Sequence, residues 1–211
     1  MSTIKVNNIE DVKTLTIGDA TAEDTKIVFD GNAQDFHIGL DDSSDSLTIG
    51  LGSTLGTTSH MVFDANGHIT KPLQPAFLAR PSGTQSDIAI DATTTVVFDT
   101  EVYDNNGDFS SNTFTAPVTG KYLLNAEVRI DNLDLNTTYY GINISASNRG
   151  VSNFESTNQF DTDPAYYHKG LTVVMDMDAN DTASITIEIA NNGAAQADIR
   201  QWSHFSGYLL G

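Results

Sequence analysis

Closely spaced carboxylates are the residues of this sequence best suited to acid–base chemistry. The pairs Asp161-x-Asp163 and Asp176-x-Asp178 have the composition of a glycosidase centre, because those enzymes hold two carboxyl groups at a fixed separation. One acid of such a pair must also have its pKa raised by a desolvating pocket. Both pairs lie beside predicted turns in a chain rich in acid, which favours solvated acidic loops. The sequence therefore predicts no catalytic residues.

The second of these pairs begins a segment that could hold a hard cation. Asp176, Asp178, Asn180 and Asp181 offer side-chain oxygens at close spacing, as calcium loops do. The segment lacks the following glycine and the distant bidentate glutamate of a helix–loop–helix calcium site. These four residues are a candidate calcium site, with a solvated acidic turn as the alternative, and no other cofactor is predicted.

Exposed aromatic side chains ringed by amides and carboxylates are the usual surfaces for binding sugars. Five residues near the ends of predicted strands are candidates for a receptor-binding surface of this kind: Tyr139, Tyr166, Tyr167, His168 and Trp202. Use in the core or in contacts between chains is the alternative, and strand alternation places Tyr140 inside. The polar stretch 148–168 is expected to be a loop at the tip, since loops on a rigid scaffold tend to carry binding specificity.

Other familiar catalytic patterns are missing from the sequence. There is no nucleophile elbow, zinc-protease helix or phosphate-binding glycine loop, and the absence of cysteine excludes disulfides and thiol chemistry. The five histidines are scattered, which favours structural or surface roles. If His37 or His60 pointed to the axis of a trimeric shaft, three copies could hold an anion, a water or a metal there.

The charge balance excludes several classes of partner. The chain has 211 residues and 22.7 kDa, with 28 acidic against 10 basic residues and a net charge of -18. Nucleic acids and anionic membrane surfaces would repel it, because binding them requires clustered Lys and Arg. No stretch approaches the roughly 18 apolar residues of a membrane span, and the opening residues have no apolar signal-peptide region. A soluble protein without an ordinary signal peptide is expected.

Hydrophobic residues alternate with polar ones along most of the chain, which predicts an all-β protein. The clearest strand runs over residues 122–130, where five apolar residues occupy every second position. Clusters of Gly, Asn and Asp separate this strand from others with the same pattern, and they predict turns. Many short strands joined by such turns indicate a sandwich or a barrel.

The first seventy residues differ from the rest and contain a repeat. Leu15-Thr16-Ile17-Gly18 returns as Leu47-Thr48-Ile49-Gly50, and Ile27-Val28-Phe29-Asp30 returns as Met61-Val62-Phe63-Asp64. Two such short copies cannot build a core alone, because repeat units bury their faces on neighbours. We expect residues 1–71 to form an intertwined shaft with other chains and residues 72–211 to form a globular head. A flexible polar arm is the alternative for residues 1–71.

A spaced series of aromatic and glycine residues resembles the signature of the complement-1q head, which shares the tumour-necrosis-factor jelly roll. The series consists of Phe98, Asp104, Phe109, Phe114, Gly120 and Tyr122. Residues 77–79, 179–183 and 205–210 are similar to the first strand, a late turn and the closing strand of that family. The interval between Phe109 and Phe114 is two residues shorter than usual, and Leu124 stands where an aromatic residue is common. The resemblance covers residues 74–211.

The whole chain is similar to short tail-fibre or fibre-tip proteins of marine phages. The similar segments are residues 2–9, the Gly-Asp-rich repeats, residues 69–77 and, most specifically, residues 111–122. The resemblance implies a homotrimer in a phage virion, assembled in the host cytoplasm and attached to other tail proteins through its N-terminus.

The expected function is adsorption of a phage to its host without catalysis. The head would bind a bacterial surface glycan or an outer-membrane protein, and three heads per fibre would turn weak contacts into firm attachment. Three alternatives stay open from the sequence: a purely structural tail-tip or capsid-decoration trimer, a glycan depolymerase, and a bacterial surface protein with a complement-1q-like head.

Overall fold

The computed structural model describes residue 6 and residues 9–210. Most of the opening segment, which the sequence predicts to attach to other virion proteins, lies outside the described residues. The described chain is almost entirely β and contains a single short 3-10 turn, η1 (Thr157–Gln159). It divides between Leu73 and Gln74 into an N-terminal unit and a C-terminal domain, two residues beyond the boundary expected from the sequence. None of the described residues forms a helix long and apolar enough to cross a membrane.

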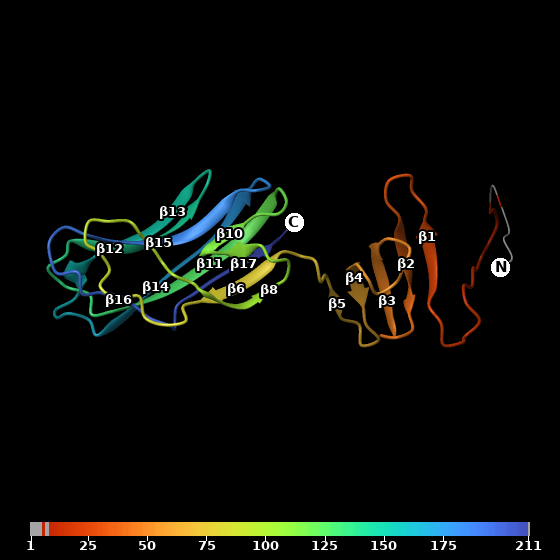
Figure 1. The fold of residues 1–211 in the computed structure, drawn as a ribbon, viewed down its shortest axis with the longest axis horizontal. Coiled ribbons are helices and arrows are strands. Elements are labelled where there is room, and N and C mark those ends of the chain that lie inside the picture. The colour runs from red at the N-terminus through yellow and green to blue at the C-terminus, as the bar shows by residue number, and fades with distance from the viewer. Residues whose placement is uncertain (1–5, 7–8, 211) are drawn as a thin grey trace. The chain divides into compact units, whose positions relative to one another are not determined.

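The N-terminal unit is one five-stranded antiparallel sheet in which each strand pairs with the next along the chain (Figure 1). Its strands are β1 (Thr25–Phe29), β2 (Phe36–Asp41), β3 (Ser46–Leu51), β4 (Ser59–Phe63) and β5 (Ile69–Thr70). The second copy of the repeat forms the β3–β4 hairpin, whereas Leu15–Gly18 of the first copy lies outside any strand. All five strands thus pair within one chain, and β1 and β5 form the two edges of the sheet.

His37 occupies the covered face of this sheet. It is fully buried, and its Nδ1–H donates to the carbonyl oxygen of Gly52 at 2.9 Å. Gly50 lies directly against the imidazole, since a Cβ at that position would meet its ring at 2.7 Å. His37 therefore has a structural role, as the sequence favours for its scattered histidines, and its ring is not free to reach a shared axis. His60 is exposed and packs edge-on against Phe36, at 6.0 Å between ring centroids.

The C-terminal domain is a sandwich of two antiparallel sheets, visible as two layers in Figure 1. In the first sheet the order is β13 (Gly150–Ser156), β12 (Tyr139–Ala146), β15 (Thr182–Ala190), β10 (Thr113–Thr115) and β9 (Phe109–Ser110), and β7 (Thr94–Thr95) also pairs with β15. In the second the order is β14 (Tyr166–Met177), β11 (Gly120–Asp131), β17 (His204–Leu209), β6 (Ala76–Arg80) and β8 (Thr100–Asp104), and β16 (Asp198–Ile199) also pairs with β11. Neighbours in space are mostly distant in sequence, so the fold depends on long-range pairing.

The spaced aromatic residues of the sequence build the core between the two sheets. Phe77 stacks on Phe109 and Phe114 at 4.9 and 4.8 Å between centroids and meets Phe205 edge-on at 5.0 Å. Glycine is required at position 207, because a Cβ there would clash with the Phe77 ring and approach Leu124 Cδ2 to 2.9 Å. This core stabilises the sandwich by burying large apolar surfaces.

Asp104, the polar member of that series, organises a turn. Its carboxylate accepts four backbone hydrogen bonds, from Asn106 at 3.4 Å, from Gly107 and Asp108 at 3.1 Å and from Phe109 at 2.8 Å. A carboxylate that satisfies successive backbone donors fixes the turn that carries Phe109 into the core. The series is therefore structural.

Two expectations about the head have opposite outcomes. The strand expected over residues 122–130 is confirmed as part of β11, and Tyr140 is buried as alternation predicts. The prediction that residues 148–168 form one long loop is wrong, because β13 occupies Gly150–Ser156 and pairs with β12 along its length. Besides residues 148 and 149, only residues 160–165, between η1 and β14, lie outside regular elements there.

Candidate functional site

One face of the β14–β11–β17–β6–β8 sheet points away from the core and carries exposed aromatic residues at one end. Alternation along β11 turns Arg129 to this face, opposite to the buried Val128 and Ile130. The Arg129 guanidinium carbon lies 4.3 Å from the centre of the Trp202 ring and 4.7 Å from that of Tyr166. We call Arg129, Tyr166 and Trp202 the Arg129 cluster. It is a cation–π arrangement that holds two aromatic rings at the surface.

Hydrogen bonds and ion pairs fix the arginine at the centre of this cluster. Asp131 accepts from Arg129 Nε at 2.7 Å and from Nη2 at 3.2 Å, a two-point contact that sets the plane of the guanidinium. Asp131 also lies 3.3 Å from Arg200 Nε. The Arg129 backbone N–H donates to Ser203 Oγ at 2.9 Å, which ties β11 to the turn bearing Trp202. The cluster is thus rigid although Tyr166 is 63% and Trp202 54% exposed.

A shallow hollow of about 310 Å³ lies beside Trp202 on the same face. We call it the Trp202 hollow; its lining residues are Leu78, Arg80, Val102, Gln201, Trp202, Ser203 and His204. An exposed indole together with guanidinium, amide and imidazole groups can stack on an apolar face and hydrogen-bond to hydroxyl groups. That combination suits a carbohydrate or a polar peptide segment.

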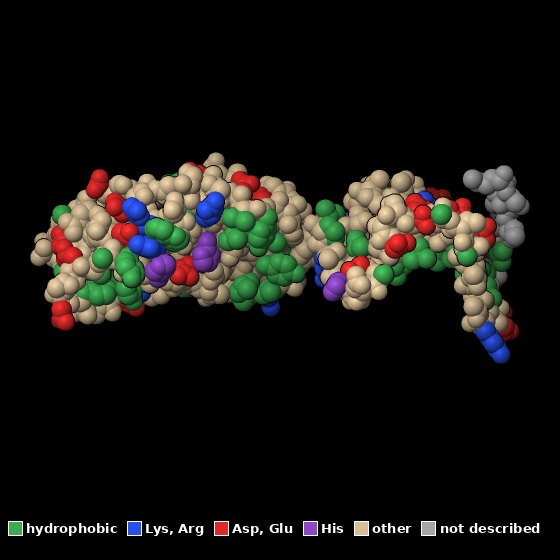
Figure 2. Space-filling view, turned by 90° about the horizontal axis from the view of Figure 1, so that it is seen from below, with side chains coloured by type: hydrophobic (Ala, Val, Ile, Leu, Met, Phe, Trp, Pro, Cys, Tyr) green, Lys and Arg blue, Asp and Glu red, His purple; other side chains and the backbone are tan. Residues whose placement is uncertain are grey.

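Polar residues occupy the middle of this sheet face. His168 Nδ1 contacts Glu127 Oε1 at 2.7 Å, and His204 Nε2 lies 3.1 Å from the Asn125 side-chain nitrogen. Figure 2 shows two groups of hydrophobic side chains on the C-terminal domain, separated by histidine, acidic and basic side chains. The face therefore has a polar middle between two apolar ends.

The end of the face opposite to the Arg129 cluster is apolar. Leu123 of β11 pairs with Val174 of β14 on one side and with Tyr208 of β17 on the other. All three are exposed, although they form one continuous row across the sheet. We call Val174, Leu123 and Tyr208 the apolar row. Because it lies six residues along β11 from Arg129, about 20 Å separates the two features.

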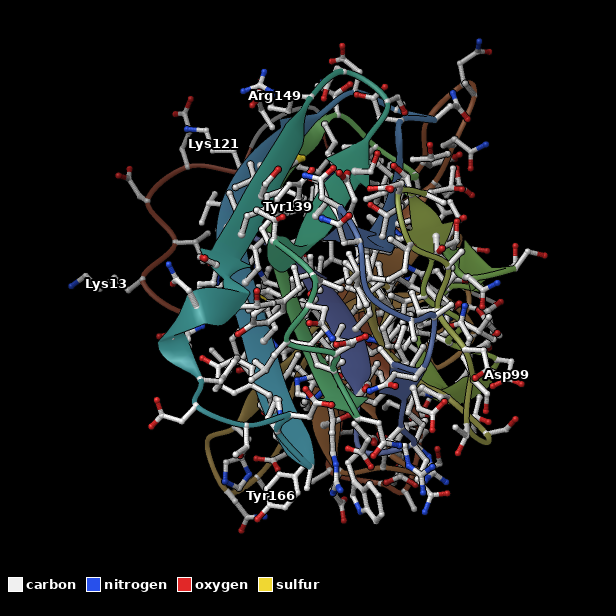
Figure 3. All side chains as sticks on the ribbon, turned by 90° about the vertical axis from the view of Figure 1, so that its left-hand side faces the viewer. Lys13, Asp99, Lys121, Tyr139, Arg149 and Tyr166 are labelled. Carbon is white, nitrogen blue, oxygen red and sulfur yellow. The ribbon has the colours of Figure 1, made fainter. Side chains whose placement is uncertain are left out.

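The structure brings together three of the five aromatic and histidine residues predicted for receptor binding. Tyr166, His168 and Trp202 share the outward face of one sheet. Tyr167, the neighbour of Tyr166 on β14, turns inward and donates from its hydroxyl to Glu155 at 3.2 Å. Tyr139 belongs to β12 in the other sheet and donates to Glu188 at 2.6 Å. Figure 3 labels Tyr139 and Tyr166, which lie on separate parts of the domain.

A buried polar network at Glu155 was missed by sequence reasoning. The side chain of Lys169 is only 2% exposed, and its ammonium lies 3.0 Å from Glu155 Oε1 and 5.6 Å from the centre of the Tyr140 ring. Glu155 Oε2 accepts from the Tyr140 hydroxyl and from Gln159 Nε2, both at 3.0 Å. The hydrogen bonds from Gln159, Lys169 and Tyr140 hold the Glu155 pKa at about 2. This network links β12, β13 and β14.

The position of Lys169 in the sequence could have predicted this network. It lies between Tyr167 and Leu171 in a period-two series, so its side chain must enter the core. A lysine at an inward position needs an acidic partner, because an unpaired buried charge is costly.

The four candidate calcium ligands lie around the turn between β14 and β15. Asp176 forms an ion pair with Arg149 at 2.8 Å. Asp181 Oδ2 accepts from the Asp178 backbone N–H at 2.9 Å and from the Asn148 side-chain amide at 3.0 Å. Asn180 has a φ of 74°, which asparagine tolerates in turns. No group of three or more His, Asp or Glu among the described residues has a metal-binding arrangement. Calcium binding at these residues and a solvated acidic turn stay the two alternatives.

Chelation distinguishes these two alternatives, and the contacts of Asp176 and Asp181 within the protein favour the acidic turn. Because Arg149 already neutralises Asp176 and protein donors occupy Asp181, we expect a chelator to leave the melting temperature of the protein unchanged. A lower melting temperature that is restored by added Ca²⁺, but not by Mg²⁺, would contradict this and identify calcium as a ligand.

Two antiparallel sheets with this strand order around an aromatic core define a jelly-roll domain. The model of the C1q domain matches residues 76–210. The chain therefore belongs to the C1q domain family. C1q domains are typically non-catalytic binding modules that form homotrimers.

Solved structures share this fold at low sequence identity. The globular domain of zebrafish complement 1qA is 18% identical, with a TM-score of 0.50, and the match covers 65% of this chain and 98% of that one. Murine APRIL at pH 8.0 is also 18% identical, with a TM-score of 0.47 and coverage of 65% and 99%. No curated protein matches the sequence.

Proposed function

We propose that this chain is a homotrimeric tail-fibre protein of a phage virion, whose C1q head binds a receptor on the bacterial surface without catalysis. The similarity of the whole chain to marine phage fibre proteins supports the virion role. Membership of a family of trimeric binding modules supports the head's role. The N-terminal segment would join other tail proteins, and assembly would take place in the host cytoplasm.

The apolar row supports the trimer. Leu123, Val174 and Tyr208 are presented on a flat sheet face, where solvated side chains would normally be polar. Contact with other copies would remove these side chains from water, and the hydrophobic effect would then favour association. Three such contacts, one per pair of chains, would close a ring and leave no open surface.

The exposed indole of Trp202 is the observation that carries the receptor proposal. Arg129 holds the ring in place, so little conformational entropy is lost when a ligand stacks on it. The neighbouring Arg80, Gln201 and His204 offer hydrogen bonds at the rim of the Trp202 hollow. A bacterial glycan fits this chemistry best, and a polar loop of an outer-membrane protein is the second choice. Three copies per fibre would multiply a weak contact through avidity.

Competition for host cells tests this proposal. The purified wild-type protein should block adsorption of the phage, and Trp202→Ala should weaken binding of one head about 30-fold, the effect of losing a hot-spot tryptophan worth about 2 kcal/mol. Phe154→Ala is the matched control, because Phe154 is an exposed aromatic residue of the other sheet. If wild-type protein never blocks adsorption, a purely structural trimer replaces the receptor role. If Trp202→Ala binds normally, the receptor site lies elsewhere.

A further inference from the structure

We infer that the N-terminal sheet packs through one apolar face against the same sheet of two other copies, so that three complete sheets form the shaft without exchanging strands. The inference rests on the proposed homotrimer and adds to it the surface that the N-terminal unit uses. It replaces intertwined strands with a face-to-face contact.

Strand register places twelve residues on this face, of which eleven are apolar. They form rows across the five strands: Thr25, Leu40, Leu47, Phe63 and Ile69; Ile27, Ile38, Ile49 and Met61; and Phe29, Phe36 and Leu51. We call them the apolar N-face. Seven of the residues are exposed in the single chain, with exposed fractions from 36% to 58%: Ile27, Phe29, Phe36, Ile38, Leu40, Leu47 and Ile69.

The opposite face cannot stabilise this sheet by itself. It buries His37, Asp41, Ser46 and Thr48, which are polar, and the loop between β3 and β4 covers it. Leu55 is the only fully buried large hydrophobic residue among the described residues of the N-terminal unit. A sheet whose apolar side chains mostly face water gains little free energy from folding. The N-terminal unit therefore needs a partner for its apolar N-face.

The backbone pairing indicates what kind of partner this is. β2, β3 and β4 each pair with strands of the same chain on both sides, so their backbone groups are satisfied. What the unit needs is therefore not a further strand, but a surface that covers its apolar side chains. The partner must therefore offer a flat apolar surface and not a sheet edge.

The distribution of charge favours another copy of this chain as the partner. The molecule has a net charge of -18, so copies repel one another wherever their acidic surfaces meet. The apolar N-face contains no Asp, Glu, Lys or Arg, and it can meet its own copies without burying a charge. The trimeric heads would also hold three of these faces close together, at an effective concentration that solution partners cannot match.

A cysteine cross-link tests the contact, and the natural chain has no cysteine to interfere. Ile38 lies in the central row of the apolar N-face, whereas Val28 pairs with His37 and shares the opposite face. Both side chains are 36% exposed in the single chain, so they are matched in accessibility. With a short thiol-specific cross-linker, full-length Ile38→Cys should give a covalent dimer on a denaturing gel, and Val28→Cys should stay monomeric.

A charge at the same position gives a second readout. Ile38→Glu should leave the chain trimeric through its head, yet amide hydrogen exchange in β2 and β3 should become at least tenfold faster. Val28→Glu should change neither property. Suppose that the wild-type protein is trimeric, but Ile38→Cys gives no cross-link or Val28→Cys cross-links equally well. Either result would overturn the face-to-face shaft and leave the trimeric head intact. A monomeric wild-type protein would instead overturn the proposed function itself.

Discussion

Replacing Leu123 by aspartate is expected to separate the three heads while each remains folded. Leu123 lies at the centre of the apolar row, and its neighbours on the strand, Tyr122 and Leu124, form the core on the other side. A carboxylate at the contact would have to lose its water without gaining a partner. At about 3 kcal/mol per contact, the association constant should fall more than 100-fold, and the mass in solution should drop to that of one chain.

The matched control for this variant is Phe154→Asp. Phe154 is 40% exposed against 36% for Leu123, but it belongs to β13 in the other sheet. The Phe154→Asp variant should keep the mass of a trimer, as measured by light scattering. Loss of the trimer in both variants would mean that any added charge disperses the chains, and loss only in Phe154→Asp would move the interface to the other sheet.

Replacing Glu155 by glutamine is expected to destabilise the head more than any exposed charge change. The substitution leaves the Lys169 ammonium buried without its carboxylate. Breaking a buried pair in this way costs about 3 kcal/mol, at the lower end of the known range because the Glu155 side chain is partly exposed. For a domain of this size the melting temperature should fall by about 10 °C. Adding Lys169→Met should restore part of the loss.

Acid and a control variant test whether the Glu155 charge is responsible. The folded pKa of Glu155 is about 2, below the ordinary value of 4.5, so its contribution to stability is present above pH 4.5 and lost between pH 4.5 and 2. Glu155→Gln should lose less stability than wild type across that range. Glu127→Gln, which removes an exposed partner of His168, should melt within about 2 °C of wild type. An equal fall in both variants would contradict a special role for the buried pair.

The sequence was sufficient for features that depend on local periodicity. Alternation over residues 122–130 predicts β11, and the resemblance of the spaced phenylalanines to the complement-1q signature implied a jelly roll, in which they form the core. β13 was not predicted, because its sequence lacks the regular alternation of a strand. Its inward positions include Asn153 and Glu155, whereas Phe154 points outward, so the apolar pattern is interrupted. Glu155 faces inward to meet Lys169, a requirement that only the folded chain reveals.

The candidate binding surface was only partly predictable. Exposed aromatic residues could be found from composition and strand ends, which correctly singled out Tyr166 and Trp202 as surface residues. Both rings contact Arg129, although the three residues lie on β11, on β14 and in the turn after β16. No local sequence pattern predicts contacts between such distant segments. Tyr139 and Tyr167 have the same residue type and setting in the sequence but point to other partners.

The mass of the intact wild-type chain in solution, measured by light scattering on a sizing column, tests the central claim most directly. We expect a single species of three times the chain mass of 22.7 kDa at micromolar concentration. A particle of one chain mass under the same conditions would contradict the trimeric fibre, the avidity of its heads and the shaft contact together.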